Sequence, residues 1–240
     1  MSNNQAFIIL HLGLGSFHRA HQAVYLQNLI DSGDKRWSLA GGNLRPDMAD
    51  TIAALENQRG EYTLETVTPA GELRYERITA ISQVIPYAPS LDELIKLGAA
   101  ANTRIISFTV TEAGYYLDAK NKLDLNFSDL ASDVKRAERG EVGETIYGAL
   151  TAILRARMAA NGGKVSLLNC DNLRHNGERF CSGLLQFIEL IGDTHLLKWV
   201  EANTTCPNAM VDRITPRPAP EVRARVKAAT GWDDAAPVMA

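Results

Sequence analysis

The residues of this chain that are best placed for chemistry follow its expected buried strands. A glycine turn at Gly13 and Gly15 comes directly after the apolar residues 7–12. In the G-x-G-x-x-G fingerprint, the first glycine makes a tight turn and the second lets the backbone approach a dinucleotide pyrophosphate. The fingerprint is incomplete, because His18 takes the place of the third glycine. The turn predicts a dinucleotide site, with a tight turn that binds no ligand as the alternative. The candidates for cofactor contact are Gly13, Gly15, Phe17, His18 and Arg19.

A further candidate for cofactor contact lies after the next expected strand, residues 37–43. Asp47 follows this strand, where an acidic side chain can accept hydrogen bonds from the ribose hydroxyls of an adenosine. A first-turn aspartate that complements the dipole of the following helix is the alternative for Asp47. Arg45 stands two residues earlier and suits a ribose 2′-phosphate, so these residues leave both NAD and NADP open.

Two later strand ends carry more polar residues. Thr111 and Glu112 follow residues 104–110, in a turn whose Gly114 allows close approach to the nicotinamide half of a cofactor. Residues 170–177 follow the expected strand 165–169 and contain more polar groups than a simple turn requires.

Within the second of these strand ends, Asn172 is the candidate to hydrogen-bond a carbonyl or a developing alkoxide. Asp171 and Asn176 are alternatively caps of the following helix. Asp212 and Arg213 form a neighbouring pair further along the chain, for which an ordinary surface ion pair is the alternative.

These candidate sites require a parallel sheet, because the carboxyl ends of parallel strands meet at one edge. Apolar periodicity and turn residues predict strands that alternate with helices, which is typical of α/β folds. The predicted strands are residues 7–12, 37–43, 62–67, 73–81, 104–110 and 165–169, and the predicted helices are residues 20–30, 46–57, 91–97, 145–158, 178–191 and 194–202.

One segment departs from this alternation. Residues 62–67 and 73–81 flank a Pro-Ala-Gly turn at residues 69–71, which predicts an antiparallel hairpin. Residues 118–143 are polar and are expected on the surface. The predicted fold class is therefore α/β and Rossmann-like, a doubly wound, mostly parallel sheet with an inserted antiparallel hairpin.

The composition excludes several classes of partner. Of the 240 residues, 45% are hydrophobic and 22% are charged, with a formal net charge of −3. This balance, without a basic cluster, argues against nucleic acid or an acidic membrane surface as the main partner. The chain shows neither a signal peptide nor an apolar run of about 18 residues. Cys170, Cys181 and Cys206 match no disulfide framework or zinc site and are expected to be buried or unreactive thiols of the reducing cytoplasm.

Four blocks of the sequence resemble, in the same order, the long-chain polyol dehydrogenases. They are residues 10–22, 109–115, 170–177 and 207–216, and the likeness covers essentially the whole chain. That family includes mannitol 2-dehydrogenase, fructuronate and tagaturonate reductases, and D-arabinitol 4-dehydrogenase. Residues 169–180 and 203–207 are most similar to the D-arabinitol branch. The family carries G-x-G-x-F-H-R in place of the usual fingerprint, so His18 is typical of it.

The resemblance implies metal-independent hydride transfer between a secondary alcohol carbon and the nicotinamide of NAD(P), with D-arabinitol and D-xylulose as the substrate pair. By position in the motifs, Asn172 would polarise the substrate oxygen, Asp212 would contact the substrate, and Val211 would line the nicotinamide side. Asp47 falls near the acidic positions for the adenosine ribose. Met48 stands where some relatives carry a second acid, so NADP stays open beside NAD.

The resemblance also implies a second, mostly helical domain that supplies a lysine general base beside an asparagine and a histidine. No such motif occurs in the 240 residues. Residues 1–240 are therefore expected to be the dinucleotide-binding domain of a longer enzyme, inactive when isolated. The alternatives are an oxidoreductase of hexuronates or of mannitol, and a non-catalytic dinucleotide-binding module.

Overall fold

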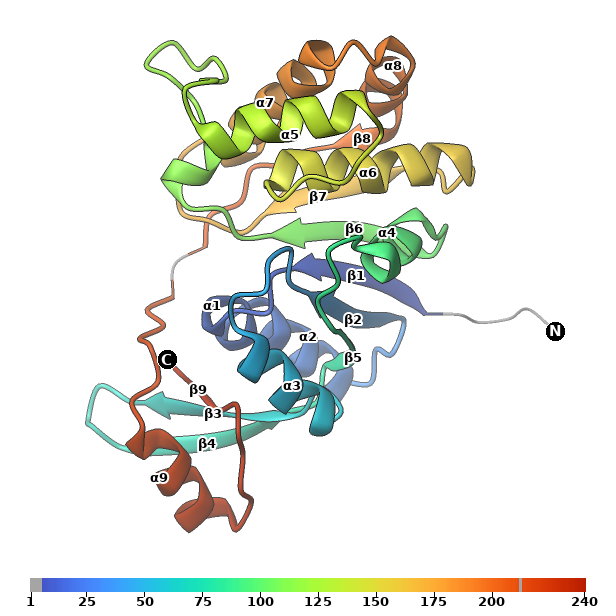
Figure 1. Cartoon of the computed structure of the whole chain (residues 1–240). Coiled ribbons are helices and arrows are strands. Elements are labelled where there is room, and N and C mark those ends of the chain that lie inside the picture. The colour runs from blue at the N-terminus through green and yellow to red at the C-terminus, as the bar shows by residue number, and fades with distance from the viewer. Residues whose placement is uncertain (1–5, 212) are drawn as a thin grey trace, which may run out of the picture. The chain divides into compact units, whose positions relative to one another are not determined.

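The computed structural model describes residues 6–211 and 213–240, which divide into two compact units. Unit 1 contains residues 6–86 and 213–240, and unit 2 contains residues 87–211. Figure 1 shows strands and helices in both units. Each unit has parallel strands of its own, and the last segment of the chain returns to the unit in which the chain begins.

Three parallel strands form the first sheet of unit 1. They are β1 (Phe7–Leu12), β2 (Trp37–Gly42) and β5 (Ile81–Ile85), in the order β5-β2-β1. The last residues of β1 and β2 are buried, as expected of parallel strands covered on both faces. α1 (Ser16–Ala20) and α2 (Gln22–Asp31) connect β1 to β2, and α3 (Ala49–Asn57) follows β2.

The second sheet of unit 1 is mixed. β3 (Tyr62–Val67) and β4 (Leu73–Ile78) form an antiparallel hairpin, and β9 (Val238–Met239) pairs parallel to β3. α9 (Glu221–Thr230) lies beside β3 and β4 (Figure 1). The predicted hairpin is confirmed, but the predicted strand 73–81 is wrong at its end. The chain leaves the hairpin after Ile78 and pairs with β2 as β5.

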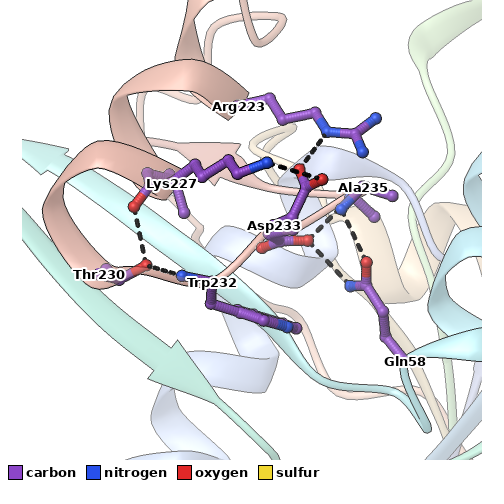
Figure 2. A network of polar contacts seen from close by, with 10 residues as sticks. Gln58, Arg223, Lys227, Thr230, Trp232, Asp233 and Ala235 are labelled. Carbon is purple, nitrogen blue, oxygen red and sulfur yellow. Dashed lines mark hydrogen bonds and ion pairs between the residues drawn. The ribbon is translucent and has the colours of Figure 1, made fainter.

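A polar network fastens the C-terminal segment to unit 1. Figure 2 shows Asp233 accepting hydrogen bonds from Arg223 and Lys227 of α9, while the Ala235 amide donates to the Gln58 side chain. Asp234 is fully buried, and its carboxylate accepts from the backbone amide of Thr63 at 2.5 Å. The bond of Asp234 holds this segment beside β3, and those of Asp233 join it to α9, so that the chain can return as β9.

An apolar cluster in the core of unit 1 includes residues of both sheets. Leu39 of β2, Leu64 of β3 and Val238 of β9 are at most 1% exposed and belong to this cluster. Because burial of a large aliphatic side chain contributes about 1.5 to 3 kcal/mol, the C-terminal strand stabilises unit 1 through packing as well as through its hydrogen bonds.

Unit 2 contains the other parallel strands. β6 (Thr103–Phe108), β7 (Val165–Asn169) and β8 (Thr204–Thr205) lie in the order β6-β7-β8. The helices are α4 (Asp92–Ala99), α5 (Ser128–Glu138), α6 (Ile146–Ala159), α7 (Asn176–Leu190), α8 (Thr194–Asn203) and the short 3-10 helix η1 (Glu112–Tyr115).

Aromatic side chains pack between β6, α6 and α7. The ring centroids of Phe108 and Phe180 lie 4.4 Å apart, and those of Tyr147 and Phe180 lie 5.4 Å apart. Phe187 stacks on Tyr147 from the next turns of α7, at 6.1 Å. All four side chains are buried, so this aromatic cluster orients α7 in unit 2.

Arg157 is the largest fully buried side chain of the described residues, and its guanidinium faces backbone carbonyls. It donates hydrogen bonds to the carbonyl oxygens of Gly98, Ala100, Gly162, Gly163 and Lys164, at 2.7 to 3.2 Å. Burial lowers the pKa of Arg157 to about 10, which still leaves it protonated at neutral pH. One side chain of α6 thus joins the end of α4 to the loop before β7.

The predicted surface segment 118–143 is only partly correct, because it contains α5. Leu130 is fully buried, and Leu130, Val134 and Ala137 recur at the three- to four-residue spacing of an apolar helix face. Asp133 is 2% exposed and accepts hydrogen bonds from the backbone amides of Glu144 and Thr145, just before α6. The charged residues between these positions concealed the helix.

The predicted helices 20–30 and 46–57 begin later than expected. The predicted helix 20–30 is divided, since α1 ends at Ala20, and His21 adopts a non-helical conformation before α2 begins. The predicted helix 46–57 begins at Ala49, because Met48 has a left-handed φ of 68°. Its first-turn acid is therefore Asp50, which removes the helix-dipole alternative for Asp47.

Candidate functional site

The glycine turn lies between β1 and α1 of unit 1. Gly13 has a φ of +116°, which L-residues rarely adopt, and its amide donates to the Gly42 carbonyl at 2.9 Å. A β-carbon on Gly15 would meet no atom within 4 Å. The backbone conformation of the turn therefore requires glycine at Gly13. At Gly15 there is open space over the backbone.

His18 lies inside unit 1 beside the turn. Its ring is 2% exposed and stacks on that of His11 with centroids 3.5 Å apart. Phe17, which is half-buried, stacks on His21 at 5.3 Å. The place of the fingerprint's third glycine is thus occupied by a packed aromatic pair.

These buried histidines make the stability of unit 1 depend on pH. Burial lowers the pKa of His11 from 6.5 to about 3, and also lowers that of His18. Below pH 6.5 the unfolded chain binds protons that the folded chain does not, so acid favours unfolding. We expect the free energy of unfolding to be highest above about pH 6.5 and to fall by about 1.4 kcal/mol per pH unit for each of the two histidines.

Urea denaturation at pH 7.5, 6.0 and 5.0 measures this dependence. His18→Phe keeps a ring in the stack and should flatten the slope, whereas His195→Gln on the exposed surface of α8 should not change it. An unchanged slope in His18→Phe would show that the buried pair does not cause the acid sensitivity.

Arg19 joins the glycine turn to the C-terminal segment. Its guanidinium donates to the carbonyl oxygens of Leu14 at 3.2 Å and Ala236 at 2.5 Å, and it lies over the Tyr62 ring. The Tyr62 hydroxyl donates in turn to the Arg19 carbonyl at 2.5 Å. Arg19 is 2% exposed, and its guanidinium binds the backbone carbonyl of Ala236, which lies 217 residues further along the chain.

The segment after β2 is tied to the glycine turn by Asn43. The side-chain oxygen of Asn43 accepts a hydrogen bond from the Leu14 backbone amide at 2.9 Å, and its side-chain nitrogen donates to the Asp47 backbone carbonyl at 3.1 Å. Asp47 itself is exposed. Sequence reasoning missed this role of Asn43, although a polar side chain directly after a buried strand is the signal for it.

A cavity of about 770 Å³ lies in unit 1 beside these elements. Ser16 and Arg19 line it from α1, and residues 48–51 line it from the start of α3. Arg217 and Arg223 line it from the C-terminal segment, the latter in an ion pair with Asp233, and Asp50 is the acidic residue of the lining. The cavity thus combines the end of the glycine turn with basic side chains, a combination that suits an anionic ligand.

In unit 2, the strand ends carry a buried hydrogen-bond network around Asp171. The Tyr115 hydroxyl donates to the Asp171 carboxylate at 2.5 Å, and Asn176 donates to the other carboxylate oxygen at 2.8 Å. The Leu173 backbone amide also donates to Asp171, at 3.0 Å, and the Asn169 side-chain amide donates to the Tyr115 hydroxyl at 2.5 Å. Burial and this carboxylate raise the pKa of Tyr115, which stays protonated.

The network fixes the backbone on both sides of Asn172, whose own side chain is exposed. Asp171 and Asn176 are not simply caps, because Asn176 lies within α7 and also accepts from the Ala209 amide at 2.8 Å. An immobile backbone that presents an exposed amide can place a hydrogen-bond donor without a large entropy cost.

The remaining predicted residues of unit 2 lie at the start of η1 and at the last position of the unit. Thr111 and Glu112 are exposed at the start of η1, and Val211 is 8% exposed at the last position of the unit. Asp212 lies outside the described residues. Unit 1 thus brings together Gly13, Gly15, Phe17, His18, Arg19 and Asp47, and unit 2 contains Thr111, Glu112, Asn172 and Val211.

The described residues contain no group of three or more His, Cys, Asp or Glu side chains that could hold a metal ion. No helix in the described part of the chain is long and apolar enough to span a membrane.

A family model described as the mannitol dehydrogenase Rossmann domain matches residues 7–240. The chain belongs to the mannitol dehydrogenase family. The membership confirms the resemblance and the α/β, Rossmann-like fold class predicted from the sequence.

Two D-arabinitol 4-dehydrogenases are similar to this mannitol dehydrogenase family member over nearly its whole length. That of Klebsiella pneumoniae is 54% identical over 99% of the chain, and that of Ralstonia nicotianae is 53% identical over 98%. The chain spans about half the length of these curated relatives, 51% and 50%.

A solved structure of the family has the same fold. The mannitol 2-dehydrogenase of Pseudomonas fluorescens, in a ternary complex with NAD and D-mannitol, superposes with a TM-score of 0.88 at 33% identity. The superposition covers 99% of this chain and 48% of that one.

Proposed function

We propose that this chain is the dinucleotide-binding part of an enzyme that oxidises a sugar alcohol to a ketose with NAD, the reaction being D-arabinitol to D-xylulose. The observation that carries the proposal is the 54% identity, over 99% of the chain, to a D-arabinitol 4-dehydrogenase. Similarity to a mannitol 2-dehydrogenase solved with NAD and D-mannitol supports the cofactor.

The geometry of unit 1 fits the pyrophosphate and adenosine ribose of NAD. The open space at Gly15 lets a pyrophosphate approach the backbone. Asp47 is assigned to the ribose hydroxyls, and Asn43 holds its backbone against the turn. Phe17, His18 and Arg19 are assigned to shaping the turn, the last two through buried side chains. Arg45 is the residue that would accommodate the 2′-phosphate of NADP. The affinities for NAD and for NADP are therefore to be compared.

The residues of unit 2 are assigned to the reacting end of the cofactor. When bound, the nicotinamide accepts hydride from the alcohol carbon. Asn172 donates a hydrogen bond to the substrate oxygen, on which negative charge develops as the hydroxyl proton leaves. Thr111, Glu112 and Val211 line the nicotinamide side, and Asp212 binds a substrate hydroxyl. The proton is taken up by a lysine of a further domain in the longer protein.

We assign this enzyme a polyol or ketose as its partner, and neither nucleic acid nor a membrane. A net charge of −3 and three cysteines without a disulfide in the described residues support this assignment and a location in the cytoplasm.

Assays of the longer protein with D-arabinitol, D-mannitol and fructuronate test the proposal. NADH formation with a clear preference for D-arabinitol is expected, and NADP should serve less well. Preference for mannitol or a hexuronate would replace the substrate assignment, and NAD binding without turnover would indicate a binding module.

The isolated 240 residues should bind NAD but should not oxidise the polyol, and robust oxidation would contradict a general base in a further domain.

The pyrophosphate site can be tested separately from the fold. Gly15→Ala should keep the melting temperature of the unliganded chain, because a β-carbon there meets no protein atom within 4 Å. The same β-carbon would fill the space assigned to the pyrophosphate, so NAD affinity should fall by at least about tenfold, or 1.4 kcal/mol. Isothermal titration with NAD and NADP measures the affinity, and unchanged NAD binding would show that the pyrophosphate does not lie over Gly15.

A further inference from the structure

Two of the three cysteines contact each other in unit 2. Cys181 lies in the second turn of α7, and Cys206 directly follows β8. The Cys206 thiol donates a hydrogen bond to the Cys181 sulfur. Both residues are partly exposed, whereas Cys170 is buried. The sequence predicts buried or unreactive thiols, and of the three only Cys170 is buried.

The backbone around the two cysteines is held in close contact. A β-carbon at Gly177 would collide with the carbonyl oxygens of Cys206 and Pro207, so the strand end packs directly on the first turn of α7. The Glu178 amide donates to the Asn208 side chain at 3.2 Å, and that side chain donates back to the Glu178 carboxylate at 2.8 Å. Since Cys181 is one helical turn after Gly177, it lies on the same face of α7. The proximity of the thiols is therefore a consequence of the fold.

The two partly exposed thiols differ in acidity. The hydrogen bond with Cys206 lowers the pKa of Cys181, which favours its thiolate, and the same bond raises the pKa of Cys206. Burial raises the pKa of Cys170 to about 12, which keeps that thiol protonated. Cys181 is thus the nucleophile of the pair, and Cys206 is placed to react with it.

We propose that Cys181 and Cys206 form a reversible disulfide, a modification site that ties the segment leading to Val211 onto α7. A low-molecular-weight disulfide such as glutathione disulfide is the oxidant. The Cys181 thiolate attacks one of its sulfurs, and the first glutathione leaves as a thiolate that takes up a proton. The Cys206 sulfur, losing its proton, then attacks Cys181 and releases the second glutathione. Two protein thiols are oxidised, and one glutathione disulfide is reduced to two glutathione molecules.

Thiol counting with peptide mapping tests the disulfide in the purified protein. Incubation with glutathione disulfide should lower the mass by about 2 Da and produce a peptide linked through Cys181 and Cys206. Alkylatable thiols in the native protein should fall from two to none, and after denaturation from three to one. Dithiothreitol should restore both counts. This readout on the unmodified sequence does not depend on the folding of any variant.

Cysteine variants provide the matched controls. Cys170→Ala should keep the 2 Da loss, and Cys181→Ala and Cys206→Ala should each abolish it. The proposal is overturned if the Cys181–Cys206 linkage is absent under conditions that oxidise free dithiols. It is also overturned if glutathione stays attached to either cysteine without exchange, or if Cys170 enters disulfides as readily as the pair.

Discussion

Replacing Asn172 by alanine is expected to lower kcat/KM for polyol oxidation by about 10²- to 10³-fold in the enzyme that contains this chain. The side chain is exposed after β7, while Asp171 and Asn176 immobilise the backbone around it. A hydrogen bond to an oxygen that gains negative charge is stronger in the transition state than in the bound substrate. The loss should therefore fall mainly on kcat, with NAD affinity within about twofold.

Steady-state kinetics and NAD titration of Asn172→Ala separate these effects. Because Asn172 is exposed, its loss should not change the thermal unfolding of unit 2. Asn126→Ala, at another exposed asparagine of the same unit, is the matched control and should keep wild-type kinetics. Full kcat/KM in Asn172→Ala would remove this residue from the reaction, and a loss confined to NAD affinity would reassign it to the cofactor.

The largest expected effect on stability is that of Arg157→Leu. The substitution leaves the carbonyl oxygens of Gly98, Gly162 and Gly163, among others, without their donor in a fully buried place. Each unsatisfied buried acceptor costs about 1 to 3 kcal/mol, and some of these carbonyls regain a partner by relaxation. We expect the free energy of unfolding of unit 2 to fall by about 3 to 5 kcal/mol.

Urea denaturation followed by tryptophan fluorescence, to which Trp199 in α8 contributes, measures this loss. Arg157→Lys retains a charge but has only three donors, so its stability should lie between those of Arg157→Leu and the wild type. Arg139→Ala, which removes an exposed pair with Glu141, is the control and should have no measurable effect. Equal stabilities for Arg157→Leu and Arg139→Ala would show that the buried bonds do not hold unit 2 together.

Local sequence predicted the elements whose signals are contained within them. The apolar run of β1, the strand β7 and the hairpin of β3 were recognised with boundaries close to those observed, because strand periodicity and turn residues are short-range properties. β5 was merged with β4, since nothing local shows that the chain changes sheets after Ile78. β9 and α9 were missed because two residues of strand and a polar helix have weak patterns of their own.

In the candidate site, too, local motifs could be predicted from the sequence, whereas side-chain contacts with distant segments could not. The sequence alone determined the family and predicted a kind of chemistry, because the glycine turn and the polar blocks after the strands are contiguous motifs. Only the tertiary structure decided that the head group of Arg19 binds Ala236, that His18 stacks on His11, and that Cys181 contacts Cys206. The direction and burial of a side chain depend on which distant segment packs against it. That information lies up to 217 residues away from the motif itself.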